Sequence, residues 1–367
     1  ALYPIIPPFI PMLKNIKVWK KNYLEWRNTF PTNPIIPSGL ENVTVHYAKY
    51  IRLPRINFFD SEGWFAYFAL KKYVKKFSNL KDTIIHGAWI FPAGHAAELL
   101  SQKYKLPFIV QLMGSDVNYI KLNTPRYRLA KKILNKANKI TSVSQVLIDE
   151  LVNKKILKNS KNTSLTHTIY NFSKFSITDK QLIKKDLGIE ESAKIIFFAA
   201  ALRKLKNCDV LIRSVVNLLN KKNNVILLIG GAGYEEDNLR QLVENEKINN
   251  NVKFLGNLDE DSIVKYYNSA DVFCLPSKSE GLPNVIIESL LCGTPVVASS
   301  VGEIPHIIED NINGFLVEPN SVESLTLGLA NALNTKWDRN FLRESVSFLS
   351  VNNVLQEYDM AYNDVIK

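Results

Sequence analysis

Six short runs of apolar and β-branched residues alternate with helical patterns in the second half of this 367-residue chain. The runs occupy residues 194–202, 224–231, 251–258, 271–277, 294–300 and 314–319. Strands that are apolar throughout, with no polar alternation, are typical of a parallel sheet buried on both faces. Alternation of such strands with helices of 10 to 15 residues indicates a doubly wound α/β domain.

The first half is less regular but favours the same fold class. Strands are expected at 43–51, 83–89, 107–114, 139–144 and 165–171, with helical patterns between most of them. A polar run at 172–182 separates the two halves. We therefore predict domains at 1–175 and 176–345, and a final helical segment at 346–367 that crosses back onto the first domain.

The composition limits the class of protein. The chain carries a net charge of +11 and three cysteines, without the paired spacing of a zinc site or a disulfide framework. Cys274 and Cys292 stand in apolar runs, so they are expected to be buried thiols in a reducing cytoplasm. The positive charge indicates either contact with an anionic membrane or a solvated lysine-rich surface. No RNA- or DNA-binding motif occurs, so nucleic acid is not an expected partner.

Residues 276–305 contain the strongest local pattern. A predicted strand ends at Pro276, a Ser/Gly-rich loop follows, and Pro283 is expected at the first position of a short helix that ends at Gly293. The free N–H groups at the start of that helix, from about Gly281 to Val285, form an anion site suited to a diphosphate. Glu280 before the helix and Glu288 within it are placed to flank one ligand. Carboxylates bind the vicinal hydroxyls of sugars well, although solvent-exposed helix charges are the simpler alternative.

The segment EGLPNVIIE (280–288) resembles the E-x7-E motif of glycosyltransferase family 4. The resemblance continues through most of residues 190–320 and more loosely through 84–118, where the chain is similar to teichuronic-acid-type enzymes of bacterial surface polysaccharides. It implies the GT-B fold, in which two Rossmann-like domains with parallel sheets face each other across a cleft. It also implies a retaining transfer, with Glu280 on the donor sugar and Glu288 on the ribose.

The resemblance supplies the remaining donor-site residues. Lys206 takes the position of the lysine that contacts the diphosphate, where a cation stabilises the leaving group. Ala201 stands where the family has arginine, so Arg203 is a candidate for the missing charge. The expected donor-binding set is Arg203, Lys206, Leu258, Glu260, Glu280, Gly281, Leu282, Pro283, Asn284 and Glu288. No cofactor and no catalytic metal are expected, because positive charge is already present at this site.

The first domain departs from the family pattern. Ala88 replaces the second histidine of the usual H-x-H-W, and Met113 stands where related enzymes have histidine or arginine. Asp116 is predicted to be catalytic together with Glu280 and Lys206, with helix capping as its alternative role. The residues expected to line the acceptor side of the cleft are Trp89, Gly94, Met113, Gly114 and Asn118.

Residues 1–40 do not resemble the family's first strand, glycine-rich loop and following helix. We therefore expect the chain to be N-terminally incomplete or to close its first sheet differently. The segment is rich in proline and aromatic residues, which fits an ordered loop or a membrane-facing stretch.

The sequence predicts a cytoplasmic glycosyltransferase, acting at the inner face of the membrane in bacterial cell-surface glycan synthesis. A UDP- or GDP-sugar would be the donor, and a lipid-linked or polysaccharide molecule the acceptor. The alternative is a catalytically impaired donor-binding partner of a glycan-assembly complex, which the replacements at Ala88, Met113 and Ala201 favour. A nucleotide-sugar epimerase of the same fold is disfavoured by the EGLPNVIIE segment.

Overall fold

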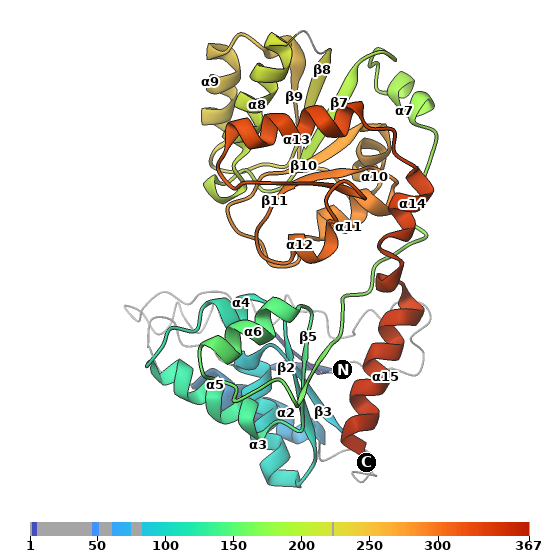
Figure 1. Ribbon diagram of the computed structural model, residues 1–367. Coiled ribbons are helices and arrows are strands. Elements are labelled where there is room, and N and C mark those ends of the chain that lie inside the picture. Colours follow the sequence, from blue (N-terminus) through green and yellow to red (C-terminus); the bar gives the residue numbers. More distant parts are fainter. Residues whose placement is uncertain (1, 6–45, 51–60, 75–82, 222–223, 367) are drawn as a thin grey trace, which may run out of the picture. The chain divides into compact units, whose positions relative to one another are not determined.

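The structure is a computed structural model that describes residues 2–5, 46–50, 61–74, 83–221 and 224–366 (Figure 1). The chain forms two compact units, one of Ala1–His167 with Gln356–Lys367 and the other of Thr168–Leu355. The divisions lie at 167/168 and 355/356, whereas the sequence patterns placed them at 175/176 and 345/346.

The second unit, Thr168–Leu355, is built on a six-stranded sheet whose paired strands all run parallel, in the order β12-β11-β10-β7-β8-β9. The strands are β7 (Lys194–Ala199), β8 (Val225–Gly230), β9 (Val252–Gly256), β10 (Val272–Leu275), β11 (Val296–Ser299) and β12 (Gly314–Val317). All six apolar runs of the sequence therefore form strands. Each strand is shorter than its run, because the ladder ends before the apolar residues do.

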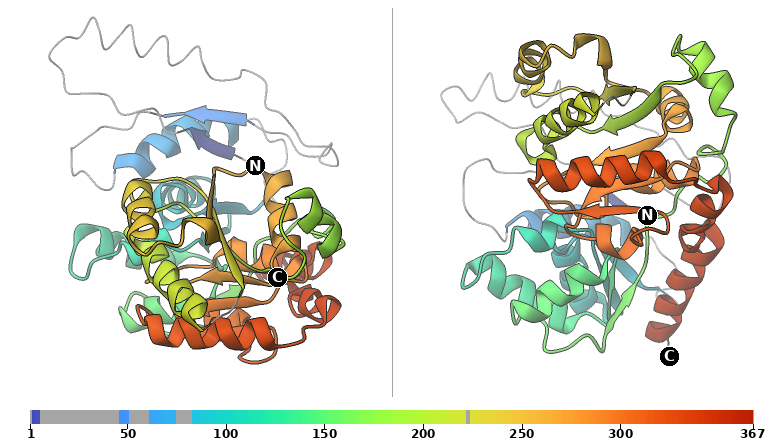
Figure 2. Two further views of the ribbon diagram at one scale, coloured as in Figure 1. Left: turned by 90° about the horizontal axis from the view of Figure 1, so that it is seen from above. Right: turned by 45° about the horizontal axis from the view of Figure 1, so that its top comes forward.

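Helices cover both faces of this sheet. They are α7 (Lys180–Asp186), α8 (Cys208–Asn220), α9 (Glu236–Asn245), α10 (Glu260–Ser269), α11 (Asn284–Leu291), α12 (Ile304–Ile307), α13 (Val322–Asn334) and α14 (Arg339–Glu344), with short 3-10 turns at Lys204–Lys206, Asn249–Asn251 and Ser347–Leu349. α8 and α13 pack together on one face, whereas α10 and α11 contact each other and the central strands (Figures 1 and 2).

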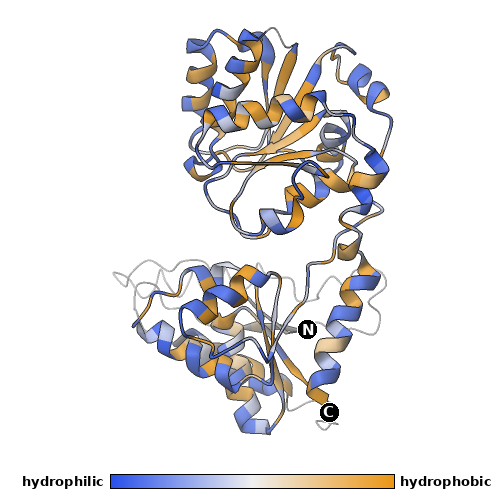
Figure 3. Cartoon of the chain, viewed as in Figure 1, coloured by the Kyte–Doolittle hydropathy of each residue, from blue (hydrophilic) through white to orange (hydrophobic). Residues whose placement is uncertain are grey.

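The core of the second unit explains why its strands were predictable. Phe197 and Phe273 sit opposite each other in the β7–β10 register, and both side chains are inaccessible to solvent. Tyr267 of α10 packs edge-on against both rings. Apolar residues follow the strands on the inside and polar ones line the outer helices (Figure 3). Burial of this kind is the main stabilising contribution to such a fold.

The first unit has a four-stranded parallel sheet in the order β3-β4-β5-β6 and a separate parallel pair of β1 with β2. Its strands are β1 (Leu2–Ile5), β2 (His46–Lys49), β3 (Ile85–Ala88), β4 (Phe108–Leu112), β5 (Lys139–Ser142) and β6 (Thr163–Leu165). Its helices are α2 (Ser61–Val74), α3 (His95–Tyr104), α4 (Ser115–Asn118), α5 (Pro125–Lys136) and α6 (Gln145–Asn153), with a π-helical turn at Ile90–Gly94.

The last helix, α15 (Val351–Ile366), begins in the second unit and ends in the first. Within the first unit it is held by residues of three strands, β3, β4 and β5: Tyr362 bonds His86 at 2.8 Å, Tyr358 bonds Gln111 at 2.5 Å, and Asp364 pairs with Lys139 at 2.7 Å. The carboxylate of Glu357 binds both the backbone N–H and the ring of His167.

Two local predictions about strands were wrong. The strand expected at 165–171 ends at Leu165, because the N–H of His167 donates to Glu357 instead of continuing the ladder. A strand, β1, precedes β2, although none was expected there. Residues 6–40 lie outside the described residues, and with them most of the segment that was expected to be an ordered loop or a membrane-facing stretch.

Candidate functional site

The loops after β7, β10 and β11 meet at the carboxyl edge of the six-stranded sheet. The N–H of Lys278 donates to the carbonyl of Leu205 at 2.8 Å, which joins the first two loops. The N–H of Glu303 donates to the carbonyl of Gly281 at 3.2 Å, which joins the second and third. This edge is where open parallel sheets bind their ligands.

Lys206 and Glu280 form a direct ion pair at this edge. The lysine Nζ lies 2.6 Å from the glutamate Oε1, and the two side chains are 23% and 9% exposed. The 3-10 turn of Lys204–Lys206 ends at Asn207, a left-handed residue (φ 52°) whose side-chain amide donates to the carbonyl of Pro276 at 3.0 Å. The loop after β10 is thereby tied to the loop that carries the lysine. Lys206 and Glu280, which the family resemblance assigned to the donor phosphate and the donor sugar, are thus adjacent.

The helix that follows this pair opens toward the same loops. α11 begins at Asn284, one residue later than predicted, because Pro283 has extended dihedrals (φ −82°, ψ 107°) and takes the N-cap position. No described residue accepts a hydrogen bond from the N–H groups of Gly281, Leu282, Asn284 or Val285. These groups form the positive end of the helix, which favours an anion.

Glu288 lies farther along α11 and has a partner that the sequence did not suggest. The hydroxyl of Tyr267, on α10, donates to Oε2 of Glu288 at 2.9 Å, and the tyrosine is completely buried. Burial raises the pKa of Glu288, and the tyrosine hydrogen bond opposes that rise. The bond occupies one carboxylate oxygen and leaves the other, Oε1, without a partner among the described residues.

A second tyrosine holds Asn284. The hydroxyl of Tyr170 donates to Oδ1 of Asn284 at 2.8 Å. Burial and the charge of Glu288 raise the pKa of Tyr170, so this phenol stays protonated. The amide Nδ2 of Asn284 remains available as a donor toward a ligand. Neither tyrosine was predicted, because each acts across long sequence separations.

Close backbone contacts surround the ion pair. Gly302 has a left-handed backbone (φ 57°), and a Cβ there would lie 2.2 Å from the carbonyl oxygen of Glu280. Gly231 (φ 113°) would bring a Cβ within 2.0 Å of the carbonyl of Ala200. Side chains at either position would push the loops apart, so the glycines let the loops of this edge pack closely.

The other predicted donor residues lie around this edge with less definite contacts. Arg203 is exposed and makes no ion pair with any described residue. Leu258 packs against Gly230, the last residue of β8. Glu260 is largely exposed and pairs with Lys174 at 2.5 Å. Their assignment to the donor remains a prediction.

Asp116 of the first unit is only 3% exposed, and its carboxylate is occupied by backbone groups. Oδ2 accepts from the N–H of Ile90 at 3.0 Å, and Oδ1 accepts from those of Met113 and Gly114 at 3.1 and 3.0 Å. Burial raises its pKa, and the N–H bonds oppose the rise. This geometry favours a structural role that differs from the helix cap named as the alternative, because Asp116 joins the turn after β4 to the turn after β3 and the N-cap of α4 is Gly114.

The residues predicted for the acceptor side lie in or next to the two turns that Asp116 joins. Trp89 is 44% exposed and left-handed (φ 66°), Gly114 has φ 118°, and Met113 is partly buried. A Cβ added at Gly94 would lie 3.0 Å from the carbonyl oxygen of Trp89, so the two residues are closely packed. Asn118 is exposed at the end of α4. His86 of β3 faces α15, where its ring nitrogen Nδ1 is hydrogen-bonded to the hydroxyl of Tyr362.

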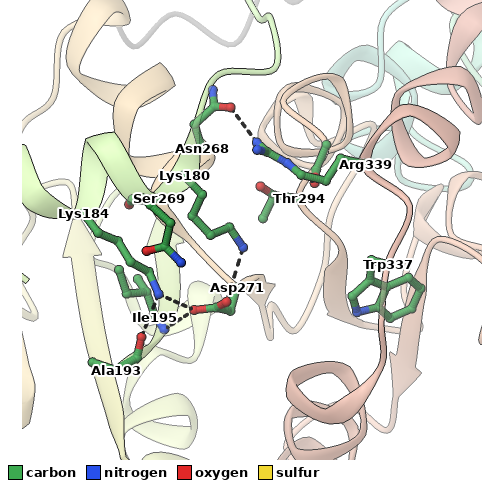
Figure 4. Close-up of polar contacts among 12 residues, drawn as sticks. Lys180, Lys184, Ala193, Ile195, Asn268, Ser269, Asp271, Thr294, Trp337 and Arg339 are labelled. Atoms are coloured by element: carbon green, nitrogen blue, oxygen red, sulfur yellow. Dashed lines mark hydrogen bonds and ion pairs between the residues drawn. The ribbon is translucent and has the colours of Figure 1, made fainter. Parts of the chain in front are cut away.

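A separate polar cluster lies near the amino ends of β7 and β10. Asp271 accepts from the N–H of Ile195 at 2.8 Å and pairs with Lys180 and Lys184 at 3.3 and 3.4 Å (Figure 4). Lys184 is buried and also donates to the carbonyl of Ala193. This cluster fastens α7 to the sheet at the edge opposite the candidate site, so its role is structural.

All three cysteines are buried and unbonded, as expected for Cys274 and Cys292. Within the described part of the chain, no three His, Cys, Asp or Glu side chains are grouped to hold a metal ion. Among the helices that the structure describes, none has the length and apolarity that crossing a bilayer requires.

Known proteins resemble this chain in sequence. Residues 179–346 match the family described as glycosyl transferases group 1. The N-acetyl-alpha-D-glucosaminyl L-malate synthase of Bacillus anthracis is 27% identical over 295 residues, which cover 77% of this chain and 75% of that protein. An uncharacterized glycosyltransferase of Methanocaldococcus jannaschii is 34% identical over 156 residues, covering 42% of this chain and 40% of that protein.

Solved structures resemble it in fold. A glycosyltransferase from Rickettsia africae superposes with a TM-score of 0.71 at 19% identity, over 88% of this chain and 86% of that one. The Anabaena protein HepE, solved with UDP, gives 0.70 at 17% identity, over 94% and 89%. The chain is therefore a glycosyltransferase with the GT-B fold, and its match to the group 1 family lies within the second unit.

Proposed function

We propose that this glycosyltransferase moves a sugar from a UDP- or GDP-sugar to a lipid-linked or polysaccharide acceptor in bacterial cell-surface glycan synthesis. The observation that carries the donor assignment is the Lys206–Glu280 pair beside the open N–H groups of α11, with Glu288 in the same helix. A cation and a helix N-terminus suit a diphosphate, and the two carboxylates suit hydroxyl groups. The Anabaena HepE structures with UDP and with UDP-glucose support a uridine donor.

In this proposal the anomeric configuration is retained. The acceptor oxygen attacks the anomeric carbon on the face from which the diphosphate leaves. The bond from that carbon to the phosphate oxygen breaks, and the acceptor's proton passes to the departing diphosphate. Lys206 and the N–H groups of α11 stabilise the charge that develops on it, so no metal ion is required.

The proposal is tested by measuring UDP or GDP release from a panel of nucleotide-sugars, with and without lipid-linked acceptors. Lys206→Ala is expected to lower turnover about 10²-fold or more, as when one preorganised donor to a developing charge is removed. Glu280→Gln is expected to lower it as well, because the amide cannot pair with Lys206 or accept as strongly from a sugar hydroxyl. Lys204→Gln, an exposed lysine of the same turn, is the matched control. Turnover equal to wild type in both site variants would remove the assignment.

One observation favours a second candidate function, a donor-binding partner that does not catalyse transfer. The carboxylate of Asp116 is fully engaged by backbone N–H groups, and Ala88 and Met113 supply no charge near it. Calorimetry that shows donor binding by wild type, combined with no sugar transfer to any acceptor offered, would select this candidate.

The cellular setting follows from the acceptor class. We propose that the protein works in the cytoplasm, peripherally at the inner face of an anionic membrane, where lipid-linked acceptors and soluble nucleotide-sugars meet. Fractionation of cells with the tagged protein tests this: recovery in a salt-extractable membrane fraction is expected, and recovery outside the cell would contradict it.

A further inference from the structure

Helix α2 exposes two large aromatic side chains to solvent. Ala66, Tyr67 and Leu70 of this helix are buried in the first unit, whereas Trp64 and Phe68 are 47% and 61% exposed. Trp64 and Phe68 are four residues apart, which places them on one face of the helix. Their ring centroids are 6.3 Å apart. They form a contiguous aromatic ridge and not two scattered exposures.

Lysines border this ridge on α2 and on its neighbour. Lys71 and Lys72 are in the last turn of α2. Helix α3 runs alongside in the same direction, because Gly63 lies against His95 at the start of α3 and Tyr104 at its end bonds the carbonyl of Lys71 (Figure 1). Lys103 and Lys105, which flank Tyr104 in the sequence, are exposed at this end of α3. We call the set Trp64, Phe68, Lys71, Lys72, Lys103 and Lys105 the aromatic–basic face.

Acidic groups are scarce on these two helices. Glu62 and Glu98 are their only acidic residues, and Glu98 is completely buried and pairs with Lys136 at 2.9 Å. The aromatic–basic face therefore has positive charge that the helices themselves do not neutralise.

We infer that the aromatic–basic face docks onto an anionic lipid surface. Trp and Phe on one side of a helix enter the boundary between headgroups and acyl chains, while lysine stems extend so that their ammonium groups reach the phosphates. Two adjacent exposed aromatic rings suit insertion into such a boundary, whereas binding of a single-stranded nucleic acid requires a groove that follows the backbone. The inference builds on the proposed membrane-bound acceptor and names the surface that would bring the enzyme to it.

The test is co-sedimentation of the full chain with vesicles of phosphatidylglycerol and phosphatidylcholine, compared with pure phosphatidylcholine. Trp64→Ala/Phe68→Ala is expected to lower the water-to-vesicle partition coefficient about tenfold or more, because the apolar area of both rings is no longer inserted. Lys71→Gln/Lys72→Gln is expected to lower it about 25-fold, at about fivefold per lysine near an anionic surface, and added salt should weaken wild-type binding.

Two control variants change similar groups elsewhere. Leu327→Ala removes an apolar side chain that is 63% exposed in the second unit, and Lys253→Gln/Lys336→Gln removes two exposed lysines there. Both are expected to bind vesicles as wild type does, and circular dichroism checks that every variant is folded.

Three results would overturn the inference: equal partition of the aromatic double variant and wild type, equal binding to neutral and anionic vesicles, or binding to single-stranded RNA without binding to vesicles. The assay uses no donor, and Glu280→Gln should bind vesicles like wild type. Failure here is thus distinguishable from failure of the proposed transfer reaction, which nucleotide release measures.

Discussion

The hydrogen bond from Tyr267 to Glu288 allows a specific test of the donor site. Tyr267→Phe removes only a hydroxyl that is fully buried and donates to Oε2 at 2.9 Å. A hydrogen bond to a charged group contributes about 1.5–3 kcal/mol. Because Glu288 is only partly buried, we use the lower end of this range, about 1.5 kcal/mol, which corresponds to a change of about tenfold in a binding constant. If Glu288 binds the donor ribose, the donor KM of Tyr267→Phe should rise about tenfold, with a smaller change in kcat.

The pH dependence provides a second readout of the same change. Burial raises the pKa of Glu288, so its ionised form is penalised in the folded protein, and donor binding by the carboxylate should weaken as pH falls through that raised pKa. The Tyr267 bond lowers this pKa. Its removal should therefore move the acidic limb of kcat/KM for the donor to higher pH.

Steady-state kinetics across pH measures both effects. The matched control is Tyr266→Phe, because the Tyr266 ring packs on Phe197 and its hydroxyl bonds to no described residue. The reasoning would be refuted if Tyr267→Phe, folded by circular dichroism, kept both the wild-type donor KM and the wild-type acidic limb.

Two further substitutions test the structure around the site. Asp271→Asn should cost about 3–5 kcal/mol in the free energy of unfolding, because it leaves the buried Lys184 without its counter-ion. Burial alone would raise the pKa of Asp271, but neighbouring lysines and the Ile195 N–H together lower it below 3.8. The ionised carboxylate therefore stabilises the folded protein at neutral pH, and this contribution is lost as the pH falls through the lowered pKa. Denaturant titrations at pH 7 and pH 3 should show a smaller gap between variant and wild type at pH 3, and an equal gap would contradict this. Gly302→Ala should raise the donor KM by displacing the carbonyl of Glu280, and an unchanged KM in a folded variant would show that this contact does not position the site.

The architecture of the second unit was predictable because the sequence features that determine it lie within short segments of the chain. Continuous apolar runs predicted all six strands, and the prolines and glycines around residues 276–305 predicted a short helix at the sheet edge. The start of α11 was misplaced by one residue, since the dihedrals of Pro283 depend on the loop before it. The strands are also shorter than predicted, because the end of a strand depends on where its neighbour stops pairing with it.

Contacts across long sequence distances could not be read from periodicity. The partnerships of Tyr267 with Glu288 and of Tyr170 with Asn284 depend on how helices and the entry segment pack. The end of β6 was misjudged because Glu357, far along the chain, takes the N–H of His167. The strand pattern placed Lys206 and Glu280 in loops at one edge of the sheet, but it did not predict their direct ion pair.

The most direct test of the donor site is a crystal structure of the chain with UDP or GDP bound. The diphosphate is predicted within hydrogen-bonding distance of the Lys206 Nζ and the N–H groups that begin α11, with the ribose hydroxyls on Glu288. A nucleotide bound elsewhere, or a Lys206 side chain turned away from its phosphates, would contradict the proposed site.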